Sequence, residues 1–584
     1  MAICPPKKID SNITGLRYAE ERCLGELPAN PIWRALEPNS YSDFGGQIST
    51  VARNPIKPSR QRKKGVVTDL EASGGFNQDI TQYNTTGLLQ GFLFADARER
   101  GTTSSLINGQ SEIVEVDGTD SAYTFNNVVA LSAVVTAGGA NYRVGDLLGY
   151  ATGAQRPARF YVLAVSPSGA VQSVAVDDAG LRAAPAAGAL AVTGGSGAGA
   201  TLTVTWGDAQ ADFVAGELVM ASGFATAANN GIKTVASSAD GILTVNEALV
   251  DEVPPLGAKV QTVGFRFAAA GASVQMNGGL ARLMSADVDL ADFGFIPGEW
   301  IYLDGFVNNS GFARISAIAG DGSYLEFDKT DWVASNESAA GITASLYFGT
   351  IIRNEPDPAL IKRRTYQIER SLGQDTVGTM SEYLIGAVAN EFTLNVAQAD
   401  KVTVDMAFIA IDNEPRSGAE GLKPGARPAL LAEDAFNTSS DFARIKLGVV
   451  DPLNSNPQAL FAFATDMTLT INNNVSANKA IGILGAFDTT TGTFEVGGSL
   501  TAYFASIDAV KAVRNNADIT MDFIMVKNNA GLLFDVPLLA LGNGRLNVEQ
   551  DQPITLPLDT SAAESKFGHT LLVQSFPYLP NSAG

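Results

Sequence analysis

The stretch Gly65-Val66-Val67-Thr68-Asp69-Leu70-Glu71-Ala72 decides how this chain is interpreted, because a similar stretch occurs near the other end. That second stretch is Gly492-Thr493-Phe494-Glu495-Val496-Gly497-Gly498. Each begins a strand–strand–helix–strand pattern, over 65–100 and over 492–526. The first helix is predicted over 88–98, and the second begins after Ser506, a residue suited to an N-cap. The recurrence predicts two copies of one β-fold, each with a flanking helix.

The segment between the two patterns, about 122–351, is rich in Gly and Ala and has a different character. Short predicted strands alternate there with glycine turns, such as the one at 138–146. The run Thr193-Gly194-Gly195-Ser196-Gly197-Ala198-Gly199-Ala200 has no GK[ST] motif and no helix behind it. It therefore predicts a turn between strands and not a phosphate-binding loop.

This segment also contains an internal repeat. Phe213-x-x-Gly216-Glu217 is matched by Phe295-x-x-Gly298-Glu299, and each match continues as four apolar or aromatic positions and a Gly-Phe pair. A predicted strand pair follows each, so we expect two small β-modules built alike. The shared Gly-Glu pair is interpreted as a turn signal and not as a binding site.

The fold class expected from these patterns is mainly β, with two β-sandwich or β-barrel modules, each with a flanking helix, interrupted by a set of small inserted β-domains. We expect an extended, irregular N-terminal arm at 1–45 because five prolines break it. We expect the first part of module 1 at 46–120, an inserted β-domain at 121–208, and two repeated modules within 209–350, at about 209–268 and 288–350. The second part of module 1 and a linker are expected at 351–430, and module 2 at 431–584.

Charge limits the classes of partner. The chain has 584 residues and a formal net charge of −21, which argues against a protein that grips nucleic-acid phosphates. Residues 1–64 hold 11 Lys and Arg against 6 Asp and Glu, so the acidic excess lies in the rest of the chain. A basic arm on an acidic body is suited to dock onto a neighbouring copy, although a solvated basic terminus explains the same pattern.

Cysteine content and apolar runs bear on the compartment. Cys4 and Cys23 are too few for a disulfide framework and are interpreted as free thiols, with one local bridge possible. The first ten residues contain no apolar signal core, and no apolar run reaches the roughly 18–20 residues of a membrane span. We therefore expect synthesis in the cytoplasm and no membrane span.

No catalytic, cofactor or metal site is predicted. His569 is the only histidine, followed by a probable strand, and is interpreted as structural. No GxSxG, DFG or EF-hand spacing occurs. The acidic pairs Asp177-Asp178 and Asp69/Glu71 are interpreted as solvated carboxylates. We therefore expect no enzyme activity and no cofactor.

Three groups of segments, in order, resemble the tail tube (major tail) proteins of bacteriophages with long non-contractile tails. The resemblance covers about 45–120 and 350–584. Its segments are Asn54–Gln61 with Lys64–Leu70 and Gly74–Phe76, then Thr365–Ser371 with Tyr383–Leu394, then Leu469–Asn474 with Val496–Phe504.

The resemblance implies a structural virion protein of the tail, made as rings that stack into a tube through which DNA passes without specific binding. Two tube folds per chain favour a homotrimeric ring, with a homohexamer as the alternative. The implied partners are further copies of the chain and the tape measure, terminator and distal tail proteins. The inserted domains are expected on the outer wall.

Two alternatives remain open. In the first, the insert binds host-surface glycans, and exposed aromatic side chains at Tyr142, Trp206, Trp300 and Tyr302 stack on sugars, whereas a core role for these residues is the simpler interpretation. In the second, the chain is another tail component, such as a baseplate or terminator subunit.

Overall fold

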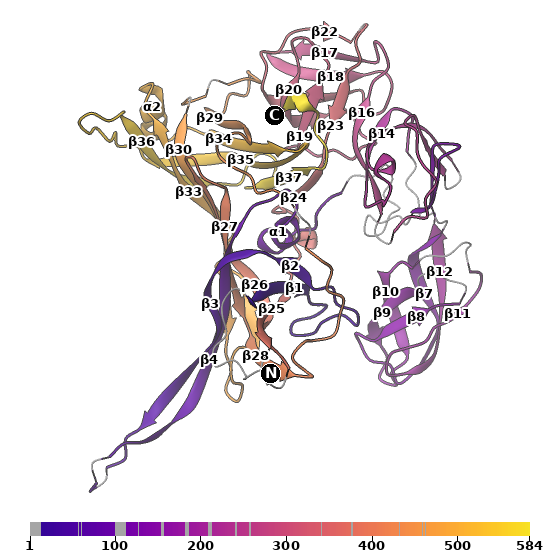
Figure 1. Ribbon diagram of the computed structural model, residues 1–584, viewed down its shortest axis with the longest axis vertical. Helices are drawn as coiled ribbons and strands as arrows, with labels where there is room; N and C mark the ends of the chain where they lie inside the picture. Colours follow the sequence, from indigo (N-terminus) through magenta and orange to yellow (C-terminus); the bar gives the residue numbers. More distant parts are fainter. Residues whose placement is uncertain are drawn as a thin grey trace, which may run out of the picture.

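The structure is a computed structural model of the chain and is built almost entirely of β-strands (Figure 1). It describes residues 13–583 except 57, 60, 100–112, 126–127, 153–156, 181–185, 208–212, 240–241, 256–257, 340, 375–377, 431–432, 458 and 462. The two α-helices in the described part are short, and all strand ladders are antiparallel. The predicted mainly-β class is confirmed.

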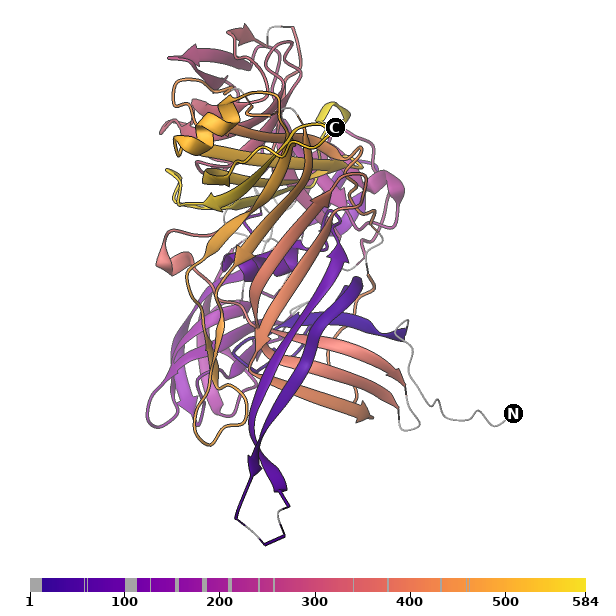
Figure 2. The same cartoon turned by 90° about the vertical axis from the view of Figure 1, so that its left-hand side faces the viewer.

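Eight strands form one continuous antiparallel path through the middle of the molecule, and several of them are seen side by side in Figure 2. In spatial order they are β3 (Pro38–Arg53), β4 (Lys63–Asp79), β27 (Thr403–Ala410), β26 (Thr379–Ala397), β30 (Ala464–Asn472), β33 (Glu495–Tyr503), β36 (Thr555–Ala562) and β35 (Ala530–Asn543). We call this path the long sheet. Its two end strands are β3 and β35.

One pairing scheme occurs twice along the chain. In the first unit, β4 pairs with β3 and β27, β26 with β27, β25 and β28, and β25 with β1. In the second unit, β33 pairs with β30 and β36, β35 with β36, β34 and β37, and β34 with β29. The further bounds are β1 (Gly15–Glu20), β25 (Tyr366–Gln374), β28 (Asp412–Gly418), β29 (Phe442–Val449), β34 (Ile519–Lys527) and β37 (Leu572–Phe576).

The helices keep the same place in each unit: α1 (Thr86–Leu93) follows β4, and α2 (Asp508–Arg514) follows β33. The strands β26 and β35 also behave alike. The first half of each pairs with two strands of a second layer, and its second half returns to the long sheet. Eight elements therefore recur in the same chain order with the same neighbours.

Period-2 alternation sets which face of the long sheet is buried. Phe392 and Leu394 of β26, Met406 and Phe408 of β27 and their neighbours point into one core that both units share. Helix α1 covers this side, since Phe92 packs on Phe392 and Phe408 with ring centroids 5.4 Å from each. The alternate residues are left on the other face.

Two expectations are corrected near the N-terminus. The described part of the predicted irregular arm contains β1, β2 (Arg34–Leu36) and the start of β3, because β1 pairs with β25 and Trp33 is fully buried against Tyr383. The helix predicted over 88–98 ends at Leu93, where Phe94 adopts a left-handed conformation. The chain then turns so that the backbone of Arg98 bridges Ile351.

A large insertion leaves the first unit between α1 and β25, where the second unit has only four residues between α2 and β34. It lies on the right in Figure 1, beyond α1, while the long sheet lies on the left. Its first part is two three-stranded sheets, β10-β9-β8 and β11-β12-β7, around one core. The bounds are β7 (Val129–Ala140), β8 (Leu147–Tyr150), β9 (Ala158–Val165), β10 (Val171–Asp178), β11 (Leu190–Ala191) and β12 (Ala198–Gly207).

The rest of the insertion forms a thirteen-stranded sheet in which the sequence repeat becomes a structural one. The order β19-β20-β21 on one side of the β23–β16 pair mirrors β13-β14-β15 on the other. The bounds are β5 (Ile113–Asp117), β6 (Ala122–Phe125), β13 (Glu217–Ser222), β14 (Gly231–Ala239), β15 (Ile242–Val245), β16 (Lys259–Arg266), β17 (Ala272–Asn277), β18 (Leu280–Ser285), β19 (Trp300–Asp304), β20 (Gly311–Ile318), β21 (Tyr324–Thr330), β22 (Glu337–Ser338) and β23 (Ser345–Tyr347). The next strand, β24 (Thr350–Arg353), pairs with β37 of the second unit instead. Strands β5 and β6 pack with 213–260, across the boundary expected at residue 121.

The repeated Gly-Glu pair forms equivalent turns. Gly216 and Gly298 have φ of 95° and 94°, a left-handed conformation that favours glycine. A second equivalence was not visible in the sequence. The Asn229 amide donates to Glu252 (2.8 Å), and the Asn309 amide donates to Glu337 in the same way. Glu252 also accepts hydrogen bonds from two backbone N–H groups of the loop after β13. Glu337 accepts from two backbone N–H groups of the loop after β19.

Among the described helices, none has the length and apolarity needed to cross a membrane.

Candidate functional site: the polar face of the long sheet

The side chains that point away from the shared core form a continuous polar surface on the long sheet, which we call the polar face. Hydroxyl, amide and carboxylate groups dominate it because the strands alternate apolar-in and polar-out. Its members are Asn77, Asp79, Glu391, Thr393, Asn395, Asp405, Asp466, Thr468, Thr470, Asn472, Glu495, Ser499, Thr501 and Asp559.

Cross-strand hydrogen bonds connect the polar face. The Asp405 carboxylate accepts from the Asn77 amide of β4 (2.9 Å) and from the Asn395 amide of β26 (2.7 Å). Where the two units meet, the hydroxyls of Thr393 and Thr470 lie 3.4 Å apart. In the second unit, Thr468 and Ser499 lie 3.0 Å apart. These contacts fix the polar side chains as a surface across both units.

The polar face is acidic. Strands β26, β27, β30, β33, β35 and β36 contain no Lys or Arg along their whole described lengths. Five carboxylates of the face are exposed, namely Glu391, Asp405, Asp466, Glu495 and Asp559. At the edge, Lys401 pairs with Asp79 (2.7 Å). These six strands therefore lack the cations with which a protein neutralises nucleic-acid phosphates.

The insertion packs on the second unit through a shared apolar layer, and we call this contact the joint. Trp300, Tyr302 and Phe312 pack against Ile524 and Leu533 of the second unit. Gln574 of β37 is fully buried in this layer and bonds both the backbone N–H (3.0 Å) and C=O (2.6 Å) of Trp300. The insertion is therefore connected through the chain to the first unit but packs on the second.

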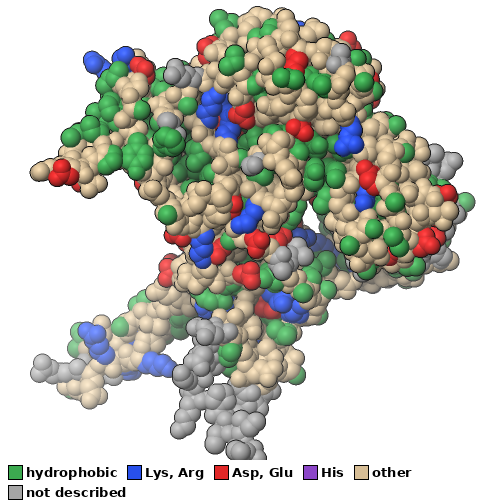
Figure 3. All heavy atoms as spheres, turned by 45° about the horizontal axis from the view of Figure 1, so that its top comes forward, with side chains coloured by type: hydrophobic (Ala, Val, Ile, Leu, Met, Phe, Trp, Pro, Cys, Tyr) green, Lys and Arg blue, Asp and Glu red, His purple; other side chains and the backbone are tan. Residues whose placement is uncertain are grey.

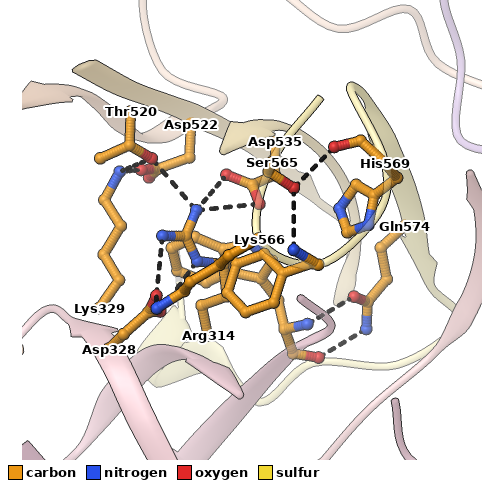
Figure 4. Close-up of polar contacts among 12 residues, drawn as sticks. Arg314, Asp328, Lys329, Thr520, Asp522, Asp535, Ser565, Lys566, His569 and Gln574 are labelled. Atoms are coloured by element: carbon orange, nitrogen blue, oxygen red, sulfur yellow. Dashed lines mark hydrogen bonds and ion pairs between the residues drawn. The ribbon is translucent and has the colours of Figure 1, made fainter. Parts of the chain in front are cut away.

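Buried charges lie at the centre of this joint (Figure 4). Arg314 of β20 pairs with Asp328 (3.0 Å) and with Asp535 of β35 (3.2 Å). Lys329 of β21 pairs with Asp522 of β34, and Arg444 of β29 also contacts Asp522. Each charge has an opposite partner, which a buried ion requires.

Burial and pairing act on these groups in opposite directions. Burial by itself would raise the pKa of Asp522, but Arg444 and Lys329 outweigh it and hold this pKa at about 2. Burial lowers the pKa of Lys329 to about 8, against the attraction of Asp522. Burial raises the pKa of Asp535 in spite of the Arg314 guanidinium. These contacts join the insertion to the second unit (Figure 4).

A family model described as phage tail tube protein matches residues 11–562 of the chain. The chain belongs to the phage tail tube protein family. Membership gives it a structural role in the tail tube, assembly into the tail polymer and a place in the virion. The predicted resemblance to tail tube proteins is thereby confirmed. No curated protein matches the chain.

The tail tube family is a structural one, which suggests a protein without enzyme activity. His569 of this tail tube protein lies in a core environment. It is fully buried, with its Nδ1 3.4 Å from Arg353 and its ring stacked on Phe567. Burial lowers the pKa of His569 to about 3, and the Arg353 charge acts in the same direction. The imidazole is therefore neutral and packs against Gly298, where a Cβ would lie 2.4 Å from its Cε1.

The aromatic residues considered for glycan stacking are largely in cores. Trp300 is fully buried, and Tyr142 and Tyr302 are 3% exposed. Trp206 is half-buried and donates from its indole N–H to the Ala186 carbonyl (3.0 Å). The simpler interpretation, core packing, accounts for Trp300, Tyr142 and Tyr302.

The two acidic pairs differ from the expectation of free solvated carboxylates. Asp177 and Asp178 both face Arg159, each at 3.5 Å. Asp69 and Glu71 both face Lys479, a residue of the connection between β30 and β33. The glycine run at 193–200 forms the predicted turn between β11 and β12 and continues into the start of β12, and the Ser196 hydroxyl donates to Asp146 (2.7 Å). Cys23 is a free, exposed thiol, and Cys4 lies outside the described residues.

Sequence patterns indicated the strands of the polar face but not which side of them is accessible, and no single residue of the face was predicted. The alternating Thr468, Thr470 and Thr501, Tyr503 positions were the available signal. The buried charges of the joint gave no signal, because their partners are up to 221 residues apart in the chain.

Proposed function

We propose that this tail tube protein forms rings in which the polar face lines the bore, and that the stacked rings conduct DNA during ejection. The observation that carries the proposal is the single acidic, hydroxyl-rich surface spanning both units. A duplex slides along such a wall because phosphate-neutralising contacts are absent from it. The insertion, on the opposite side of the long sheet, then decorates the outer wall (Figure 1).

We further propose a ring of three chains. Two units with the same pairing scheme in each chain supply six units per ring, which supports a homotrimer over a homohexamer. We assign the tail to the long non-contractile type, and we propose synthesis in the host cytoplasm. The contacts with tape measure, terminator and distal tail proteins belong to the same proposal.

Electron microscopy of the assembled protein tests ring formation. We expect stacked rings with threefold symmetry, a bore wide enough for duplex DNA and density for the insertion on the outside. A protein that stays monomeric at high concentration and is absent from virions would overturn the proposal.

A charge change tests the assignment of the bore. In phage carrying Asp405→Lys and Glu391→Lys, DNA release triggered in vitro should slow, and the slowing should diminish as salt rises. The matched control is Asp321→Lys and Asp289→Lys on the insertion. If both pairs slow release equally, the polar face is not the bore.

A further inference from the structure

We propose that the side chains of Lys329 and Asp522 condense into an amide bond, which links the insertion covalently to the second unit. Such a bond belongs to the single chain and does not depend on the ring. The ion pair between these two residues is the state from which the bond forms. An amine and two carboxyl groups meet in the joint, and all three side chains are fully buried: Lys329 on β21, Asp522 on β34 and Asp535 on β35.

These groups come from two strand pairs that face each other across the joint. Arg314 and Lys329 lie directly opposite each other on β20 and β21 of the insertion. Asp522 and Asp535 lie directly opposite each other on β34 and β35 of the second unit. Lys329 contacts Asp522 across the joint, and Arg314 does the same with Asp535 (Figure 4). Two cations of the insertion thus meet two carboxylates of the second unit.

Burial isolates the Lys329 amine from water. Figure 3 shows Lys and Arg side chains scattered over the surface of the molecule, where water solvates them. Among the pairs of a lysine with a carboxylate in the described part of the chain, Lys329 with Asp522 is the one in which both side chains are 0% exposed. The centre of the Trp300 ring lies 5.9 Å from the Lys329 Nζ. Burial also lowers the pKa of Lys329 to about 8, so more of its amine is neutral and nucleophilic than at a solvated lysine.

The reaction needs no co-reactant, and its atoms balance within the joint. The Lys329 ammonium first passes one proton to the Asp522 carboxylate, which gives an amine and a carboxylic acid. The amine nitrogen then attacks Cγ of Asp522, and a C–N bond forms. The C–O bond breaks, and the hydroxyl group leaves with a second proton taken from the nitrogen. One ammonium and one carboxylate thereby become one amide and one water.

Neighbouring side chains are placed to assist these steps. Asp535 can carry the second proton from the nitrogen to the departing hydroxyl, because it is the direct cross-strand neighbour of Asp522. Burial raises the pKa of Asp535, which suits a carboxyl group that takes up and releases a proton. Arg444 donates to the Asp522 carboxylate and can stabilise the negative charge on its oxygen during the attack. The Lys329 amine donates to the Thr520 hydroxyl (3.3 Å), which helps to hold it in place.

Placement and dryness favour condensation in this joint, although water reverses the same reaction between free molecules. Groups held in a reactive geometry reach effective concentrations of about 10⁵–10⁸ M. Bulk water is kept out, since Lys329, Asp522 and Asp535 are all fully buried. The bond would close the chain into a loop from residue 329 to residue 522 and hold the insertion on the second unit permanently.

Intact mass spectrometry of the denatured full chain tests the bond. The unmodified chain should be lighter than its sequence by one water, and a protease digest should contain a branched peptide that joins Lys329 to Asp522. Lys329→Arg keeps the positive charge but has no nucleophilic amine, so it should have its full sequence mass. Lys446→Arg is the matched control, because Lys446 is the cross-strand neighbour of Asp522 on its other side, and this variant should still lose water.

The rate of cross-linking during refolding tests the role of Asp535. Asp535→Asn should fold by circular dichroism but cross-link about 10²–10⁴-fold more slowly, and Asp535→Glu should restore part of the rate. The cross-linked chain is followed on a denaturing gel, where its closed loop should migrate faster than the open chain. Cross-linking at an unchanged rate in Asp535→Asn would overturn the role given to Asp535.

Two results would overturn the cross-link itself. The first is a full sequence mass for the folded, unmodified chain and for the same protein taken from virions. The second is a mass loss that persists in Lys329→Arg or a branched peptide that maps to Lys446. Either result would leave the joint held by ion pairs alone, and neither would affect the proposed ring.

Discussion

Individual buried charges link the insertion to the second unit. Asp522 is fully buried and lies between Lys329 and Arg444, which come from different parts of the chain. Attraction inside a low-dielectric layer is strong only while each charge keeps its partner. The joint is therefore sensitive to the loss of one side chain.

Asp522→Asn should lower the free energy of unfolding by about 3–5 kcal/mol, because two buried cations lose their counter-charge. The measurement is urea unfolding of the unassembled chain. The control is Asp508→Asn, which removes the exposed partner of Lys511 and should cause no measurable change. Equal effects of the two variants would contradict the role given to burial.

His569 predicts a pH dependence of stability. Its pKa of about 3 in the folded chain lies below the ordinary value near 6.5. Between these two pH values the unfolded chain therefore binds a proton at this residue and the folded chain does not. This contribution to stability is full above about pH 6.5 and is lost as pH falls toward 3, by up to about 1.4 kcal/mol per pH unit.

His569→Gln removes this titration. The difference in unfolding free energy between the unmodified chain and the variant should shift in favour of the variant as pH falls from 7 to 4. A difference that stays constant over that range would show that the imidazole titrates normally in the folded chain.

At the scale of elements, the two modules of the insertion give a structural reason for the repeated Gly-Glu pair. Gly216 and Gly298 adopt the same left-handed conformation at the start of equivalent strands. At both positions an added Cβ would also meet packed atoms, at 2.9 Å from the Arg266 carbonyl oxygen and 2.4 Å from the His569 ring. The glycine is therefore repeated because both positions need a left-handed backbone and leave no room for a Cβ.

Gly298→Ala should destabilise the chain by about 1–3 kcal/mol through the left-handed backbone alone, with the His569 contact adding to it. Gly320→Ala is the matched control, because its backbone is not left-handed and a Cβ there meets no atom within 4 Å. Thermal unfolding of both variants measures the difference. An unchanged midpoint for Gly298→Ala would contradict the turn interpretation.

Sequence patterns predicted elements best where a strand has one buried face. The alternation at Met467, Leu469 and Ile471 gave β30, and the Leu88 to Leu93 face gave α1. The N-terminal strands were missed because β1 pairs with β25, some 350 residues away, and β2 pairs with β1, while prolines obscured both strands locally. The early end of α1 follows from tertiary contacts of Arg98 and not from helix propensity.

At the scale of the whole molecule, the similar sequence patterns at 65–100 and 492–526 correspond to a strand-pairing scheme that occurs twice in the structure. The sequence indicated β4 with α1 and β33 with α2 and assigned 351–430 to the first module, but it did not indicate how the strands of each unit pair, since pairing between distant segments leaves no local signal. Alternation predicted that the C-terminal strands have one polar side, but not which residues form the polar face, because the face exists only when eight strands from both units align.

The two parts of the insertion predict different outcomes on deletion. Replacing residues 128–207 by a Gly/Ser linker should leave assembly intact, because that part has its own core. Removing 113–349 should abolish soluble assembly, since it uncovers Ile524, Leu533 and Phe576 of the second unit. Size-exclusion chromatography with electron microscopy distinguishes these outcomes, and assembly of the larger deletion would contradict the structural role of the joint.

The insertion occurs in one unit and rests on the other, and this unequal arrangement has a consequence for imaging. In the proposed ring, the inner wall repeats every 60° while the outer decoration repeats every 120°. Averaging with the higher symmetry would preserve the strands around the bore and dilute each decoration to half its density. Averaging with the lower symmetry would restore it. A partial-density outer layer in such a map would therefore report duplication within the chain, and not loss of the insertion from some subunits.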